Sequence, residues 1–493
     1  MSENSFRDYL SRKNIGLIAG PVAFIVMLVL PVPENLEPEA WRVAATAIFM
    51  AIWWVTEAVP IPVTALLPII FFPVMDVMEI AGATQPFANP LIYLFMGGFI
   101  IALAMEKTNL HKRVALRIVR FVGTSPKAIV IGFMGAAAFL SMWVSNTATA
   151  MMMLPIAVSL IELVEENPEA ENGALETNFA LVLLLSLAYA CNIGGIATLI
   201  GTPPNALMAG FMLDNYDVDI GFGQWMLVGL PVAVVALPIV YLILTKILLP
   251  IKMETISGGR ELIMKELDEM GKISQQEKMV GYVFLLTAIL WILRPLLESY
   301  ISNISDTGIA IFGAVLMFLL LDNKENGELE FVLKWDDAKR LPWEVLILFG
   351  GGLSLAAGIT ETGLAEWVGE SLAGLEFLHI ALLIVLSLLA IIFLTEVTSN
   401  TATAAAFIPI LASVAITMGY DPLILAAPAA IGASCAFMLP VATPPNAIVF
   451  GSNLISIPQM AKVGVVFNFL MVFVITSVLY LTMGYVFGVE FGF

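Results

Sequence analysis

Long apolar stretches, separated by short polar ones, occupy most of the chain. A helix needs roughly 20 consecutive apolar residues to cross the hydrocarbon core of a bilayer, and many of these stretches approach that length. The pattern predicts an all-α polytopic membrane protein with about eleven transmembrane helices. The expected spans are 15–32, 41–58, 62–76, 91–106, 178–212, 226–249, 279–297, 305–322, 343–359, 421–446 and 463–488.

Two further apolar segments, 128–160 and 379–418, are each interrupted midway by the tripeptide Ser-Asn-Thr. The half on either side of the tripeptide is short for a full crossing of the bilayer. We therefore predict two re-entrant helical hairpins with the tripeptides at their tips, in addition to the spans.

The chain contains two copies of one pattern. The six residues 145–150 return as 399–404, which is 254 positions later, and Gly97 has its counterpart at Gly351 with the same spacing. The motif Thr-Pro-Pro-Asn occurs at 202–205 and again at 443–446, only 241 positions later. The first copy therefore holds about thirteen additional residues, which we expect within the acidic stretch 162–176.

The repeat sets the domain organisation. An N-terminal segment with the first helix (1–40) is followed by repeat one (41–249), a linker (250–278) and repeat two (279–493). Each repeat holds five spans and one hairpin, and an odd number of spans inverts the second copy. Inverted repeats with interrupted helices are typical of secondary transporters, whose substrate site lies near the bilayer midplane.

The basic residues assign the sides of the membrane. With the N-terminus in the cytoplasm, every Lys and Arg except Arg42 and Arg294 falls on the cytoplasmic side, as the positive-inside rule requires. The C-terminus is then outside, the first hairpin enters from the cytoplasm and the second enters from outside. Residues 111–122 mix basic and apolar positions and indicate an interfacial helix on the cytoplasmic face.

Composition supports a membrane protein that contacts lipid. Sixty per cent of the residues are hydrophobic and 13 per cent are charged, with a mean hydropathy of +0.95. A soluble protein has roughly 45–50 and 25 per cent. The net charge of −18 comes from acidic loops, and no basic tract indicates nucleic-acid binding. No nucleophile–base pair or metal-binding cluster is visible in the spans, which disfavours an intramembrane enzyme.

The two motifs carry the candidate chemistry. Ser, Asn and Thr at a helix break offer oxygens to a cation and hydrogens to an anion, beside the partial positive charge of a helix N-terminus. Such residues also serve as packing contacts between helices, but two copies at matched positions favour a binding role. Thr-Pro-Pro-Asn predicts a broken span whose loop faces the hairpin tip, rather than a simple proline kink.

No Lys or Arg lies in any of these motifs. A divalent anion bound there needs its charge offset by co-bound cations, and the repeat predicts two symmetric cation sites. Two acidic residues also fall within apolar surroundings, Glu57 and Glu396. Either could carry a proton, order a hairpin or form an interhelical hydrogen bond.

Two further segments, 53–60 (WWVTEAVP) and 64–68 (TALLP), add to these motifs. Together they make the chain resemble the divalent anion:sodium symporter family of the INDY type over nearly its whole length. The resemblance implies a homodimer in which each protomer has a scaffold domain and a mobile transport domain that moves as an elevator. It also implies sodium-coupled symport of C4 dicarboxylates such as succinate, malate and fumarate into the cell, across the cytoplasmic (inner) membrane. Na⁺ would be the co-transported ion, and no organic cofactor is expected.

The resemblance also implies the site residues. The substrate carboxylates would be held by Ser145, Asn146, Thr147, Thr202, Pro203, Ser399, Asn400, Thr401, Thr443 and Pro444. A first Na⁺ would be bound by Ser141, the Val144 carbonyl, Asn146 and Gly201. A second would be bound by Thr395, Thr398, Asn400 and Ala442.

Alternatives remain at this stage. Some members of the family exchange anions without sodium, and the motifs also suit a carrier of citrate or sulfate. An anion channel is a third possibility, which the closed, symmetric tips disfavour.

Overall fold

The computed structural model describes residues 12–123, 125–165, 173–253, 256, 258–323, 329–371 and 379–491. Much of the segment 162–176, where the additional residues of repeat one are expected, lies outside these described residues. Arg7 and Lys324, two of the basic residues that assign the membrane sides, also lie outside them. The described chain is nearly all helical, as the apolar pattern predicts.

Prolines set the start of many helices, because a proline in the first turn leaves no N–H unpaired and its φ angle suits a helix. Pro38, Pro90, Pro126, Pro203 and Pro444 each begin a helix. The elements up to the end of repeat one are α2 (Arg12–Val29), α3 (Pro38–Thr56), α4 (Ile61–Thr64), α5 (Leu67–Val74), α6 (Ile80–Thr84), η1 (Gln85–Ala88), α7 (Pro90–Lys107), α8 (Leu110–Val122), α9 (Pro126–Ser141), α10 (Asn146–Glu165), α11 (Gly173–Ile196), α12 (Pro203–Tyr216), α13 (Phe222–Leu242) and η2 (Ile243–Leu248).

Helix α14 (Gly259–Glu269) lies in the linker, and the remaining elements belong to the second half. These elements are α15 (Gln275–Leu297), α16 (Asp306–Leu319), β1 (Leu321–Asn323), β2 (Leu329–Phe331), η3 (Trp335–Arg340), α17 (Trp343–Glu361), α18 (Leu364–Ser371), α19 (Ile380–Thr395), α20 (Asn400–Thr417), α21 (Leu423–Ala433), α22 (Pro444–Phe450) and α23 (Ile457–Phe487).

The structure refines two expectations. The described chain is nearly all helical but includes β1 and β2, which pair as an antiparallel hairpin; strands of three residues are too short to show alternation in the sequence. The expected span 62–76 is two short helices, each with a proline in its first turn. The interfacial position expected for residues 111–122 stays a prediction. Helix α8 covers this segment, and its Arg113 is buried and forms a two-bond ion pair with Glu277 (2.6 and 3.1 Å).

Eight helices of the described chain are long and apolar enough to cross a membrane, and six shorter apolar helices accompany them. The protein is therefore a multi-pass membrane protein by length and composition of its helices. The count of eleven spans, the side on which each loop lies and the inverted orientation stay predictions.

The repeated glycines bring the two halves into contact. A Cβ atom at Gly97 on α7 would lie 2.7 Å from the backbone of Ala310 on α16, and one at Gly351 on α17 would overlap the carbonyl oxygen of Ala65 between α4 and α5. Only glycine permits such a close approach. The glycine-bearing helix of each repeat thus packs against the other repeat.

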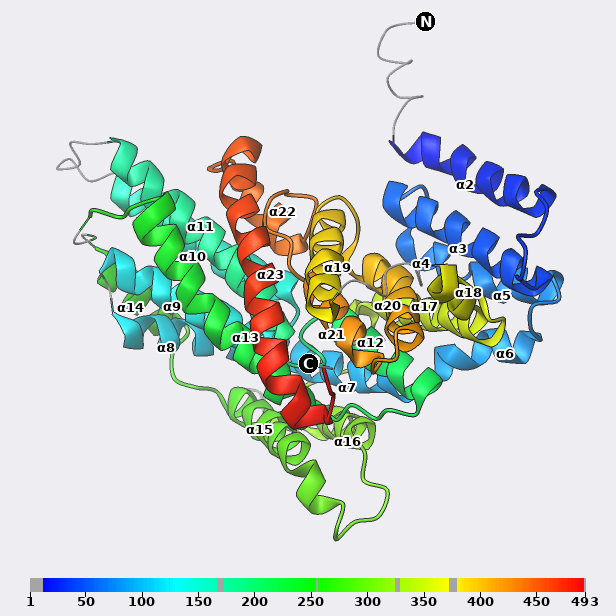
Figure 1. The fold of residues 1–493 in the computed structure, drawn as a ribbon. Helices are drawn as coiled ribbons and strands as arrows, with labels where there is room; N and C mark the ends of the chain where they lie inside the picture. The colour runs from blue at the N-terminus through cyan, green and yellow to red at the C-terminus, as the bar shows by residue number, and fades with distance from the viewer. Residues whose placement is uncertain are drawn as a thin grey trace, which may run out of the picture.

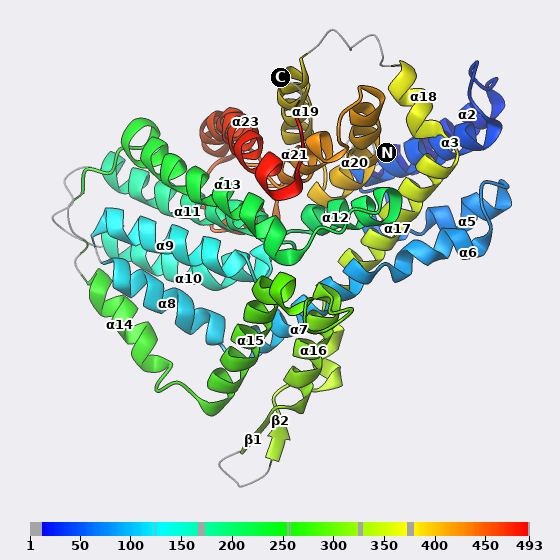
Figure 2. The same ribbon diagram turned by 60° about the horizontal axis from the view of Figure 1, so that its bottom comes forward.

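Figures 1 and 2 show how the elements are grouped. Helices α8–α11 with α13 and α14 lie at one side of the molecule, and α2–α6 with α17 and α18 lie at the other. Helices α19–α23 lie between these groups. In both views α15 and α16 extend away from the rest, with the β-hairpin at their far end in Figure 2.

Candidate functional site

Both Ser-Asn-Thr tripeptides lie at a break between two helices. Helix α9 ends at Ser141 and α10 begins at Asn146, while α19 ends at Thr395 and α20 begins at Asn400. Ser145 acts as a cap, since its Oγ accepts a hydrogen bond from the backbone N–H of Ala148 (3.1 Å). Each tip is therefore a helix N-terminus, which offers backbone N–H groups and a partial positive charge.

Both Thr-Pro-Pro-Asn motifs follow a break in a helix. Residues 197–202 separate α11 from α12, and residues 434–443 separate α21 from α22. The motif asparagine satisfies the carbonyl groups that the break exposes: Asn205 Nδ2 donates to the carbonyl of Thr198 (2.9 Å), and Asn446 Nδ2 donates to those of Ala436 and Leu439 (both 3.1 Å). Unwound backbone at membrane depth needs such internal partners.

The two breaks are joined across the repeats. Thr202 Oγ1 lies 3.1 Å from Ser434 Oγ, and Asn192 Nδ2 donates to Thr443 Oγ1, also at 3.1 Å. The threonine of each motif thus has its partner in the other repeat, Ser434 in the break after α21 and Asn192 near the end of α11. This cross-pairing brings the two motifs together at one place in the molecule.

A cavity of about 920 Å³ lies where the breaks and the tips meet. All ten residues expected to hold the substrate line it, and so do five of the residues expected to bind Na⁺. The ten are Ser145, Asn146, Thr147, Thr202, Pro203, Ser399, Asn400, Thr401, Thr443 and Pro444. The five are Asn146, Gly201, Thr398, Asn400 and Ala442.

Charged residues from other elements complete the cavity wall. Two are basic (Lys13 and Arg340) and three are acidic (Glu57, Glu106 and Glu344), so the wall carries a formal charge of −1. Of these five, the sequence analysis singled out Glu57; it missed the part that Lys13, Glu106, Arg340 and Glu344 play in the cavity wall, because they come from α2, α7 and the η3–α17 region, outside the repeated motifs. The wall as a whole does not supply the positive charge that a dianion needs.

Two of the residues expected at the first Na⁺ site, Asn146 and Gly201, lie close to one point. A Cβ atom added at Gly195 would lie 3.0 Å from both Asn146 Oδ1 and the carbonyl oxygen of Gly201. Among the described residues Asn146 Oδ1 has no hydrogen-bond partner, and buried Ser141 Oγ has only the weak Cys191 thiol beside it. Val144 is buried behind the tip. Buried oxygens without donors are costly, and a hard cation satisfies them.

Two of the residues expected at the second Na⁺ site, Thr395 and Asn400, are bonded to each other. Thr395 Oγ1 donates to Asn400 Oδ1 (2.7 Å) and lies 3.0 Å from the carbonyl of Ala433. Thr398 Oγ1 lies 2.6 Å from Thr403 Oγ1. The oxygens that would face a cation are close together, but a hydroxyl hydrogen occupies the Asn400 oxygen.

The two candidate carboxylates differ. Glu396 is buried at the second tip and accepts four hydrogen bonds, from the backbone N–H groups of Phe437 (2.7 Å), Met438 (2.9 Å) and Leu439 (3.0 Å) and from Asn468 Nδ2 (2.8 Å). It therefore orders the break of repeat two. Glu57 is exposed at the end of α3 and lines the cavity. The interhelical hydrogen bond that was one of the roles expected for Glu57 is not found among the described residues.

The fold is shared with solved membrane transporters. The YdaH transporter of Alcanivorax borkumensis matches with a TM-score of 0.58 and 13% identity, over 84% of this chain and 88% of that one. MtrF of Neisseria gonorrhoeae matches with a TM-score of 0.55 and 12% identity, over 96% of both chains. The likeness to these two structures concerns the fold and covers most of the chain.

The sequence then specifies the family. Residues 11–489 match the family described as the sodium:sulfate symporter transmembrane region, and the chain belongs to this family. A protein of Staphylococcus saprophyticus named sodium-dependent dicarboxylate transporter SdcS is 44% identical over 98% of this chain and 94% of its own length. The protein of the same name from Staphylococcus aureus is 44% identical over 97% and 92%.

Proposed function

We propose that this protein is a secondary active transporter that couples the uptake of C4 dicarboxylates, such as succinate, malate and fumarate, to the inward movement of Na⁺. One observation carries the proposal: uncharged tips from both repeats line one cavity, beside buried oxygens of Ser141 and Asn146 that have no strong hydrogen-bond partner among the described residues. The names of the relatives at 44% identity support both the substrate class and the ion.

The two tips suit a substrate with two carboxylates. The N-termini of α10 and α20 both reach the cavity, and each offers hydroxyl groups, an amide and backbone N–H groups to one carboxylate. Thr202 and Thr443 lie beside them, held by their partners in the opposite repeat. In this proposal the spacing of the two tips selects the length of the dicarboxylate.

The ions supply the charge that the side chains do not. One Na⁺ would be held by Ser141, the Val144 carbonyl, Asn146 and Gly201, and the other by Thr395, Thr398, Asn400 and Ala442. In this proposal Asn146 and Asn400 each bind an ion through one side-chain atom and also face the substrate from the tip. Ion and substrate therefore stabilise each other's binding. That mutual dependence is the coupling.

The cavity wall indicates which side has access to the site. Lys13 and Arg340 line the cavity, and the distribution of basic residues assigns both to the cytoplasm. We take this structure as an inward-facing state of an elevator, in which a transport domain carrying both tips moves against a scaffold in each protomer of a homodimer. The N-terminus would be cytoplasmic, in a cytoplasmic (inner) membrane.

Uptake of labelled succinate by proteoliposomes tests the proposal. An inward Na⁺ gradient should drive saturable accumulation above the external concentration, and replacing Na⁺ by K⁺ should abolish it. Uptake that needs internal dicarboxylate and not Na⁺ would instead identify an exchanger. Non-saturable flux that never exceeds equilibrium would identify a channel, and transport of citrate or sulfate alone would refute the substrate class.

A further inference from the structure

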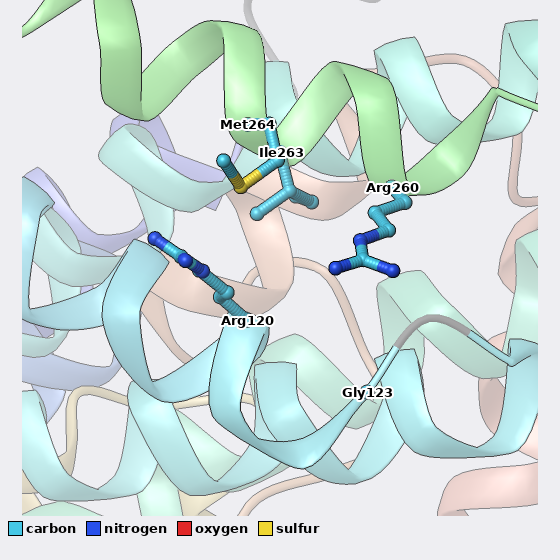
Figure 3. Close-up of a pocket in the computed structure, with 5 residues that line it drawn as sticks. All are labelled: Arg120, Gly123, Arg260, Ile263 and Met264. Atoms are coloured by element: carbon cyan, nitrogen blue, oxygen red, sulfur yellow. The ribbon is translucent and has the colours of Figure 1, made fainter.

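A small cleft between α8 and α14 lies apart from the substrate cavity. Its volume is about 170 Å³, and Arg120, Gly123, Arg260, Ile263 and Met264 line it. Figure 3 shows Arg120 extending from α8 and Arg260 extending from α14, with Ile263 and Met264 between them on the α14 side. Two guanidinium groups from different helices therefore border one small space.

Two other basic residues of α8 are paired with carboxylates, while Arg117 has no ion pair among the described residues. Lys112 Nζ lies 2.8 Å from Glu266 Oε2 on α14, and buried Arg113 pairs with Glu277. Arg120 and Arg260 have neither a carboxylate nor a hydrogen-bond partner among the described residues. Both side chains are exposed, so solvent and salt screen their mutual repulsion. An anion that lies between them would gain charge-assisted contacts from both guanidinium groups.

The surroundings of the cleft indicate where that anion comes from. Phe121, next to Arg120, is 92% exposed, and Val122 is also exposed at the same end of α8. An amphipathic helix with basic residues and an outward phenylalanine is typical of a segment that lies in the membrane interface. Guanidinium groups bind phosphate oxygens in a two-bonded geometry that ammonium groups cannot provide.

We propose that this cleft binds the phosphate group of an anionic phospholipid, which bridges Arg120 and Arg260 and ties α8 to the inter-repeat helix α14 at the membrane surface. Phe121 enters the acyl-chain region beside the bound headgroup. The ligand class is a phosphodiester carried by a lipid, because the cleft lies beside the exposed apolar residues Phe121 and Val122 at the end of α8.

Titration of the purified full-length protein in a neutral detergent tests this site. Phosphatidylglycerol is added at rising mole fraction, and its apparent affinity is read from the shift in thermal unfolding. Phosphatidylcholine and inorganic phosphate are titrated in parallel. We expect phosphatidylglycerol to stabilise the protein, with phosphatidylcholine and inorganic phosphate giving little shift at matched concentrations.

Variants locate the effect. Arg120→Gln and Arg260→Gln should each weaken phosphatidylglycerol binding on the order of tenfold, the loss expected for one charge-assisted contact. Arg117→Gln is the matched control, because Arg117 is exposed on the same helix, carries the same charge and does not line the cleft. The loss of phosphatidylglycerol affinity in Arg117→Gln should be less than half of the loss in either cleft variant.

Three results would overturn the proposal. Equal losses in Arg117→Gln and the two cleft variants would show diffuse charge attraction. Unchanged binding in the cleft variants would show that the lipid binds elsewhere. A full shift with inorganic phosphate alone would show that the anion is not a lipid headgroup.

Discussion

The two hairpin tips share a six-residue sequence but differ in how their oxygens are bonded. At the first tip, Asn146 Oδ1 has no hydrogen-bond partner in the described chain, whereas at the second tip Asn400 Oδ1 accepts a bond from Thr395. The residue equivalent to Thr395 in repeat one is Ser141, whose hydroxyl forms no hydrogen bond with Asn146 Oδ1. The first ion site thus presents open oxygens to a cation, while the second must first rotate a hydroxyl away.

The hydrogen bonds that join each tip to the broken helix of its own repeat also differ between the two repeats. In repeat one, Thr198 Oγ1 donates a single bond to the carbonyl of Met142 (2.5 Å). At the equivalent positions of repeat two, Glu396 replaces Met142 and accepts the bond from the backbone of Leu439, with three further donors. Equal motifs therefore do not imply equal sites, and the second half is held by the stronger contacts.

The largest expected effect comes from the tip asparagines. Asn146→Ala removes an oxygen from the proposed ion site and an amide from the tip, and should reduce Na⁺-driven succinate uptake by more than about a hundredfold. Asn400→Ala should do the same. Size-exclusion chromatography serves as the control, since the variants should remain folded. Near-normal uptake by either variant would count against the site.

The next largest effect is on the free energy of unfolding, which should differ between variants of the two joining contacts, Glu396 in repeat two and Thr198 in repeat one. Glu396→Gln places an NH₂ group among backbone N–H donors and removes charge-assisted bonds, and should lower the free energy of unfolding by about 2–4 kcal/mol. Thr198→Val removes one neutral bond and should cost about 1 kcal/mol. Denaturant titration in mixed micelles measures both. Equal costs for the two variants would refute the difference between the joins.

A methyl group added at Gly195 tests the first ion site directly. Gly195→Ala places a carbon 3.0 Å from Asn146 Oδ1 and from the Gly201 carbonyl, and should raise the Na⁺ concentration for half-maximal uptake about tenfold. Position 436, the equivalent in repeat two, is already alanine, so Ala436→Gly is the matched control and should shift that concentration less than twofold. A Gly195→Ala protein with unaltered Na⁺ dependence would place the ion elsewhere.

The smallest effect distinguishes the two hydroxyl groups beside the tips. Ser141→Ala should weaken Na⁺ dependence severalfold without lowering stability, because its hydroxyl makes no strong bond in the described structure. Thr395→Val should weaken Na⁺ dependence and also destabilise the fold by about 1 kcal/mol, because it breaks the bond to Asn400. Loss of stability in Ser141→Ala, or none in Thr395→Val, would contradict the contrast between the tips.

Sequence reasoning located the helix breaks because proline and a repeated tripeptide are local signals. Asn146 and Asn400 begin helices, and Pro203 and Pro444 do so after unwound segments. The bonding of those residues was not predictable, because it depends on contacts between halves that are distant in sequence. Thr202 with Ser434 is one example, and the burial of Arg113 against Glu277 is another. The short strands β1 and β2 carried no pattern to detect.

The central claim is that cations, rather than a basic side chain, offset the charge of the dicarboxylate. Calorimetric titration of succinate into the purified protein at a series of Na⁺ concentrations tests it most directly, with Arg340→Gln, at the one arginine in the cavity wall, measured alongside. The affinity for succinate should rise steeply with Na⁺ in both proteins, and the affinity for Na⁺ should rise by the same factor with succinate. A succinate affinity that is indifferent to Na⁺, and that is lost in Arg340→Gln, would contradict the account.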